Sequence, residues 1–382
     1  MRFIQGEAAC ACVIPTRDRS RRLLATLEKI SQTPGPDIEV VVLDNGSIDD
    51  TPQKVRDAYP DVTVIEMGKN LGTAARNVGA EQAKSPVILM LDDDSGPLPG
   101  TVERIIEALA DPSIGAVACR VLLPGGAFEE GGSRHVFIGC GAAFRKKVFL
   151  DIGGYDLEYE TYVEEYDVSY RILANGLTVQ FVEGCDVWHE PEARDSFDYM
   201  VEKLTANNAY LAAKYYPFPE AAEHVAWNVY RYGIFARQKS ADAGYRRAME
   251  MLPEKLQRGL THRSELPAFV LQQIIPRQAA LSNFIELTTQ GVKRIAFFRA
   301  GKEIPGLIQA ACDAKLEVTA IFEPAEGLLA DVGQIHDVPV RDAAALPDAK
   351  AYDRIVIGGT SEGFVANSQK MAESLKIELL IV

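Results

Sequence analysis

Residues 87–94 read VILMLDDD, an apolar run that ends in three consecutive carboxylates. Five apolar residues in a row are typical of a strand buried on both faces of a parallel sheet. Two earlier apolar runs, residues 12–14 and 40–43, also end in polar segments, PTRDR at 15–19 and DNGS at 44–47. In a doubly wound sheet the carboxyl ends of the strands share one crevice, where ligands bind. We therefore expect the three polar clusters to converge on one nucleotide and its metal ion.

The bulk properties limit the class of protein. With 382 residues, the chain is expected to form two or three domains. A hydrophobic content of 47% and a charged content of 25% are typical of globular proteins, and the net charge of −14 argues against a general nucleic-acid binder. No apolar stretch reaches the roughly 20 residues of a membrane span, and no secretory signal core is seen. The six cysteines show neither metal-site nor disulfide spacing, so we expect reduced thiols in a cytoplasmic protein.

The first 120 residues alternate strand and helix patterns, which predicts a mostly parallel sheet with right-handed crossovers. The expected strands cover residues 11–14, 39–43, 62–66 and 87–91. The expected helices cover residues 20–31, 52–58, 74–83 and 101–109, the last with Thr101 as its N-cap.

The rest of the chain divides into three regions. Shorter strands and glycine-rich turns fill residues 115–190, with one helix over 163–174. Residues 194–290 are predicted to be helical, divided by Pro217, Pro219, Pro253, Pro267 and Pro276. A second alternating region has expected strands at 294–298, 317–322, 354–357 and 378–382. We predict three parts, at residues 1–193, 194–290 and 291–382.

Seven short motifs occur in the order found in family 2 glycosyltransferases. They are VIPTRDR at 13–19, DNGSIDDT at 44–51, NLG at 70–72 with ARNVG at 75–79, LDDD at 91–94, GCG at 139–141, GGYD at 153–156 and EEYDVSYR at 164–171. The first half of the chain, through His189, resembles that family. The resemblance implies an α/β fold of GT-A type, a doubly wound mixed sheet followed here by a helical segment and a small Rossmann-like domain. It also implies inverting sugar transfer from a UDP- or dTDP-sugar to a hydroxyl acceptor in surface glycan or polysaccharide synthesis.

The resemblance further implies a nucleotide site. Its expected members are Pro15, Thr16, Arg17, Asp44, Asn45, Arg76, Asp92 and Asp93. Asp44 would accept the imide N–H of uracil or thymine, Thr16 would hold the base through its backbone, and Asp92 or Asp93 would contact the ribose. Arg76 would lie beside the base and diphosphate; from the residues alone, a solvated helix face remains an alternative for it.

The resemblance also implies a metal site at Asp94 and His189. Mg²⁺ or Mn²⁺ there would act as a Lewis acid on the leaving diphosphate, and hard divalent cations favour carboxylate and phosphate oxygens. From the residues alone, two alternatives stay open. The acids would then form a solvated loop, and His189 would be a packed or hydrogen-bonded surface residue.

The catalytic base that the resemblance implies is Glu165, with Glu164 in reserve. A base removes the proton from the acceptor hydroxyl during one displacement, which inverts the anomeric configuration. Acids are also favoured in the first turn of any helix, so a structural role remains an alternative. Asp167 and Arg171, four residues apart, are compatible with a surface ion pair.

Gly139, Cys140 and Gly141 are predicted to line the sugar and acceptor site, since small residues permit close backbone approach. Cys140 is not expected to be a nucleophile, because only His135 lies near it in sequence. The glycine-rich loop at residues 124–134 is either a mobile lid or a surface excursion.

The C-terminal region lacks a dinucleotide fingerprint, because only Gly301 and Gly306 are present, with Pro305 between them. Glu323 ends a strand where related folds place a ribose-binding acid, and residues 358–361 offer N–H groups to an anion. We interpret this region as a scaffold for assembly or partner docking.

Two other functions remain open: a sugar nucleotidyltransferase, and a non-catalytic nucleotide- or glycan-binding scaffold. The expected partners are a nucleotide-sugar donor and a glycan, lipid-linked or protein acceptor, with no nucleic acid. A homo-oligomer and a peripheral position at the inner face of the membrane are compatible with the sequence.

Overall fold

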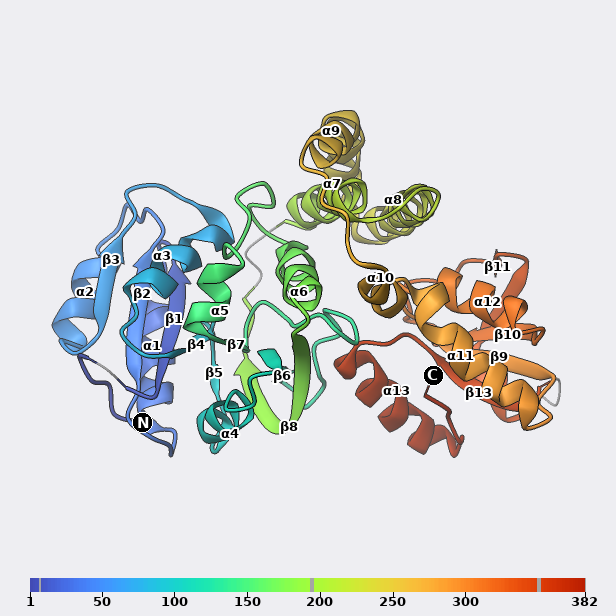
Figure 1. Ribbon diagram of the computed structural model, residues 1–382, viewed down its shortest axis with the longest axis horizontal. Helices are drawn as coiled ribbons and strands as arrows, with labels where there is room; N and C mark the ends of the chain where they lie inside the picture. Colours follow the sequence, from blue (N-terminus) through green and yellow to red (C-terminus); the bar gives the residue numbers. More distant parts are fainter. Residues whose placement is uncertain (7, 193–195, 349–351, 382) are drawn as a thin grey trace. The chain divides into compact units, whose positions relative to one another are not determined.

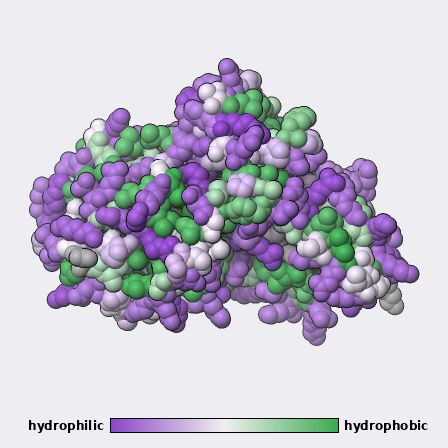
Figure 2. Space-filling model, in the orientation of Figure 1, coloured by the Kyte–Doolittle hydropathy of each residue, from purple (hydrophilic) through white to green (hydrophobic). Residues whose placement is uncertain are grey.

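The computed structural model describes residues 1–6, 8–192, 196–348 and 352–381 (Figure 1). The chain separates into two compact units, Met1–Arg194 and Asp195–Val382, each with its own hydrophobic core. On the face that Figure 2 shows, hydrophilic residues predominate and hydrophobic residues lie among them in several groups. None of the helices that the structure describes has the length and apolar character needed to cross a lipid bilayer. All six cysteines are free thiols, and five of them are buried.

The first unit is built on an eight-stranded mixed sheet in the order β3-β2-β1-β4-β7-β6-β8-β5. The strands are β1 (Cys10–Thr16), β2 (Glu39–Asp44), β3 (Thr63–Glu66), β4 (Val87–Met90), β5 (Ser95–Pro97), β6 (Ile114–Leu122), β7 (Ala142–Arg145) and β8 (Thr178–His189). Parallel pairs join β3, β2, β1 and β4, whereas β7 runs antiparallel to both β4 and β6. The prediction of a mixed α/β sheet is confirmed.

Helices cover both faces of this sheet. They are α1 (Ser20–Gln32), α2 (Thr51–Ala58), η1 (Gly72–Ala74), α3 (Ala75–Gln82), α4 (Thr101–Ala108), α5 (Lys146–Asp151) and α6 (Glu164–Ala174). Alternate residues of β1 point to opposite faces, so Cys12 and Ile14 pack in one core with Leu27 of α1. Ala11 and Val13 pack in the other core, beneath α3. The sheet is thus buried on both sides, as its continuous apolar strands predict.

The predicted cap of α4 is wrong. The residue before the helix is Gly100, with φ of 83°, and Thr101 is the first helical residue. The Thr101 hydroxyl instead donates to the carbonyl of Asp186 and accepts from its N–H, at 2.7 and 3.1 Å. Thr101 therefore ties α4 to β8.

The second unit begins with helices and ends with a smaller sheet. The helices are α7 (Phe197–Tyr215), α8 (Glu220–Lys239), α9 (Asp242–Thr261), α10 (Ala268–Ile274) and α11 (Pro276–Thr289), followed by α12 (Ile304–Asp313), η2 (Ala343–Asp348) and α13 (Glu362–Leu375). Pro253 does not divide the helices as predicted, because it lies inside α9. Helix α9 also packs closely on α7, since a Cβ on Gly259 of α9 would lie 2.6 Å from the carbonyl oxygen of Tyr210 in α7.

The smaller sheet has the order β11-β12-β10-β9-β13 and is parallel except for β11. Its strands are β9 (Arg294–Ala300), β10 (Glu317–Glu323), β11 (Gln334–Ile335), β12 (Val338–Asp342) and β13 (Arg354–Gly358). The structure adds β11 and β12, which the sequence did not indicate. The strand expected at 378–382 does not form in its described part. Leu380 makes one bridge to Val356, and residue 382 lies outside the described residues.

The carboxyl ends of β9, β10 and β13 are bonded to one another. Glu323, at the end of β10, is buried, and its Oε2 accepts the N–H of Ala300 at 2.7 Å. The N–H of Gly301 donates to the carbonyl of Gly358 at 2.8 Å. The turn at Gly301 and the turn at 358–361, which was predicted to bind an anion, therefore pack against each other.

Candidate active site

The sheet order of the first unit reverses between β1 and β4, where ligands bind in doubly wound folds. Thr16, at the end of β1, pairs in register with Asp44 of β2, and Met90 of β4 pairs with Val13. The acidic triplet 92–94 thus lies just beyond the end of β4, beside β1. The structure brings together the three polar clusters singled out in the sequence.

The three acids of the triplet have different surroundings. Asp93 is fully buried and accepts a hydrogen bond from the Thr16 hydroxyl at 2.8 Å. Its carboxylate also pairs with Nε of Arg19 at 3.2 Å. The Asp92 side chain is 34% exposed. Of the two acids predicted to contact a ribose, only Asp92 is placed to reach a ligand, because Asp93 is turned into the protein.

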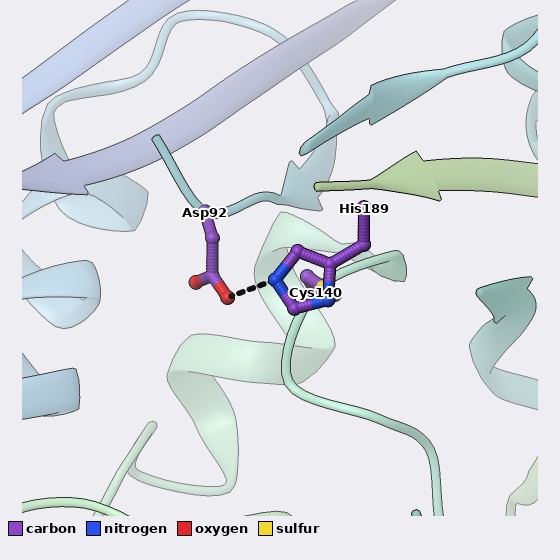
Figure 3. A group of neighbouring side chains, drawn as sticks. All are labelled: Asp92, Cys140 and His189. Carbon is purple, nitrogen blue, oxygen red and sulfur yellow. Dashed lines mark ion pairs between the residues drawn. The ribbon is translucent and has the colours of Figure 1, made fainter. Parts of the chain in front are cut away.

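Asp94 and His189 are brought together by a ladder between β5 and β8. Ser95 pairs with His189, and the N–H of Glu190 donates to the Asp94 carbonyl at 3.0 Å. The Nε2 atom of His189 lies 3.4 Å from Asp94 Oδ1 and 3.9 Å from Asp92 Oδ2. Figure 3 shows the His189 imidazole turned toward the Asp92 carboxylate, with Cys140 beside it.

The donor atoms at this position fit a divalent cation. Two carboxylates and an imidazole nitrogen are hard or intermediate ligands, of the kind that Mg²⁺ and Mn²⁺ accept. Burial lowers the pKa of His189, but its hydrogen bonds with Asp94, Cys140 and Glu129 have the larger combined effect. The pKa of His189 therefore lies well above its ordinary value. A proton on Nε2 and a metal ion would therefore compete for the same carboxylates.

The Cys140 thiol lies within 4.8 Å of the facing atoms of Asp92 and His189. Burial raises the pKa of Cys140 to about 12, so the sulfur stays protonated at neutral pH. His189, and not the His135 that is near in sequence, is the histidine beside it. A protonated, buried thiol is a poor nucleophile.

Two residues of the site were not predicted from the sequence. Arg19 pairs with Asp94 Oδ2 at 3.0 Å and with Glu192 at 3.5 Å. Glu129, in the loop at 124–134, lies 2.9 Å from Nδ1 of His189. Arg19 ends a motif that was singled out, so its position gave a signal. Nothing in the sequence near Glu129 indicated that its loop folds onto the end of β8.

Arg76 is buried, so the alternative of a solvated helix face is wrong. Its guanidinium pairs with Asp92 and donates to the carbonyl of Leu91 at 3.1 Å. Burial lowers the pKa of Arg76, but the charge of Asp92 and the hydrogen bond to it, together with the charges of Tyr155 and Glu164, raise the pKa above its ordinary value. Arg76 therefore fixes the position of Leu91 and Asp92, where the acidic triplet begins.

The end of β2 presents a buried acceptor. Asp44 is buried; its Oδ2 accepts the N–H of Ser47 at 3.2 Å, whereas Oδ1 has no hydrogen-bond partner among the described residues. Asn45 is also buried, and its amide is engaged with the loop at 70–72. It donates to the Gly72 carbonyl at 3.0 Å and accepts from the Leu71 N–H at 2.7 Å.

The other predicted members of the nucleotide site are Pro15, Thr16 and Arg17, at the end of β1 and just after it. Pro15 pairs with Leu43 in the sheet. The carbonyl of Thr16 accepts the N–H of Asn45 at 2.8 Å, so its backbone already links β1 to the end of β2. The Arg17 side chain is 50% exposed and lies 3.7 Å from Asp18.

Glu164 and Glu165 start α6 but face different surroundings. Glu164 is buried, and burial together with the charge of Glu165 raises its pKa well above the ordinary value. Glu165 is partly exposed, and its Oε1 lies above Gly139, 3.0 Å from where a Cβ would stand. Of the two predicted bases, Glu165 is the one that solvent and a ligand can reach.

The glycines at 139 and 141 have different reasons for being small. Gly141 has φ of 87°, and a Cβ there would lie 2.8 Å from Val187 and 3.1 Å from Cys119. Packing against β6 and β8 thus requires a glycine at 141, so its smallness does not indicate close approach to a ligand. Gly139 leaves room for Glu165.

Asp167 and Arg171 do not form the surface pair that their spacing suggested. Asp167 is fully buried, and its Oδ2 accepts from Arg171 Nε at 2.9 Å. Arg171 also donates to the carbonyls of Ile152 and Gly154. The pair therefore joins α6 to the turn that follows α5.

Comparison with known proteins identifies related sequences. Residues 11–135 match the family model described as glycosyl transferase family 2. A protein described as an uncharacterized glycosyltransferase, from Haemophilus influenzae, is 27% identical over 180 residues, which cover 42% of this chain and 60% of that protein. The N-acetylglucosaminyl-diphospho-decaprenol L-rhamnosyltransferase of Mycobacterium tuberculosis is 24% identical over 219 residues, covering 44% of this chain and 70% of that protein.

Among solved structures, a mannosyltransferase from Pyrobaculum calidifontis in complex with GDP-Man and Mn²⁺ aligns with a TM-score of 0.46. The identity is 19%, over 80% of this chain and 86% of that chain.

Proposed function

The N-terminal part of this chain is a glycosyltransferase family 2 domain, and on that premise we propose that the protein is a metal-dependent, inverting glycosyltransferase. The donor would be a UDP- or dTDP-sugar and the acceptor a hydroxyl group. One observation carries the proposal: Nε2 of His189 lies 3.4 Å from Asp94 and 3.9 Å from Asp92, at the edge of the sheet where a nucleotide binds.

The pyrimidine preference is supported by Asp44. Its buried Oδ1 is an acceptor that has no hydrogen-bond partner among the described residues, and burial of such a group costs free energy unless a donor is supplied. The imide N–H of uracil or thymine is such a donor. We assign Asp44 to the base, Asp92 to the ribose, and Pro15, Thr16, Arg17 and Asn45 to the walls that shape the nucleotide site.

Asp94 and His189 would hold Mg²⁺ or Mn²⁺, with Asp92 as the neighbouring carboxylate. When bound, the ion stabilises the negative charge that develops on the leaving diphosphate. The chain's own residues prepare this position: Arg76 and Arg19 balance the carboxylates, and Asp93 fixes the turn through Thr16. Both arginines also lie close enough to the acids to contact a diphosphate bound there.

Glu165 is proposed as the base. Its carboxylate is partly exposed and lies over Gly139, where there is no side chain to displace it. It can therefore accept the proton of an acceptor hydroxyl as that oxygen attacks the anomeric carbon. Glu164, which is buried beside it, remains the reserve. Cys140 and the Gly139 backbone would form part of the wall near the sugar and acceptor.

For the acceptor, the mycobacterial relative's name supports a lipid-linked glycan, and hexosyl or deoxyhexosyl transfer in polysaccharide synthesis is the corresponding class. We also propose three parts, at residues 1–193, 194–290 and 291–382, with the last as a scaffold for assembly, and a cytoplasmic protein that works at the inner face of the membrane. The chain spans 60% of the length of the Haemophilus relative, so the activity of the whole relative is not carried over to this chain.

A screen of nucleotide sugars tests the proposal. Purified protein is incubated with each donor and Mn²⁺ or Mg²⁺, and release of nucleoside diphosphate is measured with and without chelator. We expect one UDP- or dTDP-sugar to be hydrolysed or transferred only with metal. Asp94→Ala and Glu165→Gln should each lower the rate at least about a hundredfold. Asp151→Asn, an exposed carboxylate on α5, is the control and should be fully active.

Other outcomes would favour the alternatives. Full activity in both Asp94→Ala and Glu165→Gln would refute the proposed roles. Pyrophosphate release from a nucleoside triphosphate and a sugar phosphate would indicate a nucleotidyltransferase. Nucleotide binding without turnover across the whole panel would indicate a non-catalytic scaffold.

A further inference from the structure

The His189 imidazole lies between two sets of carboxylates. Its Nε2 faces Asp94 and Asp92, and its Nδ1 lies 2.9 Å from Oε2 of Glu129. The His189 side chain is 13% exposed and that of Glu129 33%. The contact is therefore partly screened from water, which strengthens a hydrogen bond to a charged acceptor.

We propose that Glu129 is a positioning residue that orients His189 toward a divalent cation. This inference rests on the proposed metal-dependent function. An imidazole that ligates a metal through Nε2 carries its remaining proton on Nδ1, and that proton needs an acceptor. Glu129 is placed to accept it, so the carboxylate fixes both the tautomer and the angle of the ring.

The loop that carries Glu129 is tied to the strands of the site. The N–H of Glu129 donates to the carbonyl of Val121 in β6 at 2.9 Å, and Leu122 forms a bridge with Phe128. The guanidinium of Arg120 lies over the Phe128 ring, 5.1 Å from its centre. The backbone bond of Glu129 and the contacts of the preceding Phe128 therefore tie this part of the loop to β6.

The same strands set the position of His189. Arg120 of β6 makes two hydrogen bonds to Asp186 of β8, at 2.8 and 3.1 Å, three residues before His189. Asp186 is in turn held by Thr101. Glu129 thus lies in a loop that is bonded to β6, and His189 ends β8, the strand to which β6 is cross-linked.

A purely structural ion pair between Glu129 and His189 makes a different prediction. Its loss would lower the thermal stability of the metal-free protein and leave metal affinity unchanged. A positioning role predicts the opposite: removal of the carboxylate weakens metal binding, because a second carboxylate behind a ligating histidine commonly changes affinity ten- to a hundredfold.

The test measures Mn²⁺ binding to the full-length protein, without donor and with UDP, by calorimetry and by the electron paramagnetic resonance signal of free Mn²⁺. We expect Glu129→Ala to weaken binding ten- to a hundredfold and Glu129→Gln, which keeps an acceptor oxygen, to weaken it less. Glu130→Gln, at the exposed next position, removes the same charge from the same loop and should change affinity less than twofold. In an His189→Asn background, Glu129→Ala should have no further effect.

Each result separates the possibilities. Equal Mn²⁺ affinity in wild type and Glu129→Ala would overturn the positioning role and leave the proposed function intact. The same holds if Glu129→Ala weakens binding equally in the His189→Asn background, since Glu129 would then act only as a distant charge. If wild type binds no Mn²⁺ even with UDP, the metal-dependent function fails and this inference fails with it. If Glu129→Ala does not fold, Glu129→Gln decides the question, and unchanged affinity in that variant would overturn the proposal.

Discussion

The carboxylate of Glu165 lies directly above Gly139, so a Cβ at position 139 would stand 3.0 Å from Glu165 Oε1. Gly139 precedes β7 and Glu165 lies in the first turn of α6, so the two residues come from separate parts of the fold. Because Gly139 has no Cβ, the carboxylate of the proposed base can lie at this position.

Gly139→Ala should therefore impair transfer without unfolding the protein. The backbone of Gly139 is not in the left-handed region, so alanine is tolerated, but its methyl group must displace the Glu165 carboxylate. We expect the rate to fall ten- to a hundredfold, as for other small misplacements of a reacting group. Gly333→Ala, where nothing lies within 4 Å, is the control. Full activity of Gly139→Ala in a donor-transfer assay would show that Glu165 does not need this position.

Glu164 should make the stability of the first unit depend on pH. Burial and the charge of Glu165 raise the pKa of Glu164 in the folded state, so the folded protein binds a proton that the unfolded chain releases. This contribution to stability is complete below the unfolded pKa, near 4.5, and is lost as the pH rises through the folded pKa.

Glu164→Gln, which cannot ionise, should therefore gain stability relative to wild type as the pH rises from 4.5 to 8. The measurement is urea unfolding at several pH values, with Glu107→Gln on α4 as the control for the substitution itself. A stability difference between Glu164→Gln and wild type that stays constant with pH would contradict the raised pKa.

Two aspartate pairs with the same spacing should differ in their contribution to stability. The Asp167 side chain is fully buried and that of its partner Arg171 is 21% exposed, whereas the side chains of the Lys147–Asp151 pair are 84% and 59% exposed. Asp167→Ala leaves the guanidinium of Arg171, which is 21% exposed, without its carboxylate and should lower the free energy of unfolding by about 3 kcal/mol. Asp151→Ala should lower it by no more than about 1 kcal/mol. Similar values for both in denaturant titrations would mean that burial does not distinguish the pairs.

His224, on α8, should destabilise the second unit in acid. Burial, with the charges of Lys302 and Arg231, lowers the pKa of His224 to about 4, and its Nε2 lies 3.1 Å from Asn208 Oδ1. The unfolded chain takes up this proton near pH 6.5 and the folded protein does not. Stability is therefore lost as the pH falls from about 6.5 to about 4, by at most about 3 kcal/mol.

His224→Gln should remove this part of the pH dependence. Thermal unfolding between pH 7 and pH 4 measures it, and His336→Gln, at an exposed position, is the comparison. The same acid sensitivity in His224→Gln and wild type would assign the effect to other groups.

Much of the first unit could be predicted from local patterns. Alternating apolar runs with helical segments between them gave β1, β2 and β4 with small errors at their ends, because buried parallel strands are continuous apolar runs. The error at Thr101 came from a residue type that suits a cap but is used to bind Asp186 across the sheet. In the second unit, β12 was missed because its sequence, VPVRD, contains a proline and two charges.

The site could be predicted only to the level of its strand ends. The family resemblance implied a metal site at Asp94 and His189, but the sequence does not show that the pairing of β5 with β8 brings these two side chains within 3.4 Å. Nor does it state that Asp93 turns inward while Asp92 stays exposed. Contacts such as Glu129 with His189 join residues 60 positions apart through a loop whose path depends on the whole sheet.

Because Asp93 turns inward, two of the three consecutive aspartates, Asp92 and Asp94, remain available to an ion. The central carboxylate works as a strut, tied to Thr16 and Arg19, and only its two neighbours face the imidazole of His189. In a protein redesigned at this point, an amide in the middle position would be expected to keep both outer oxygens in place if it kept the tie to Thr16. Ion binding would then require acids at positions 92 and 94 only. The residue at position 93 would need only to anchor the turn between them.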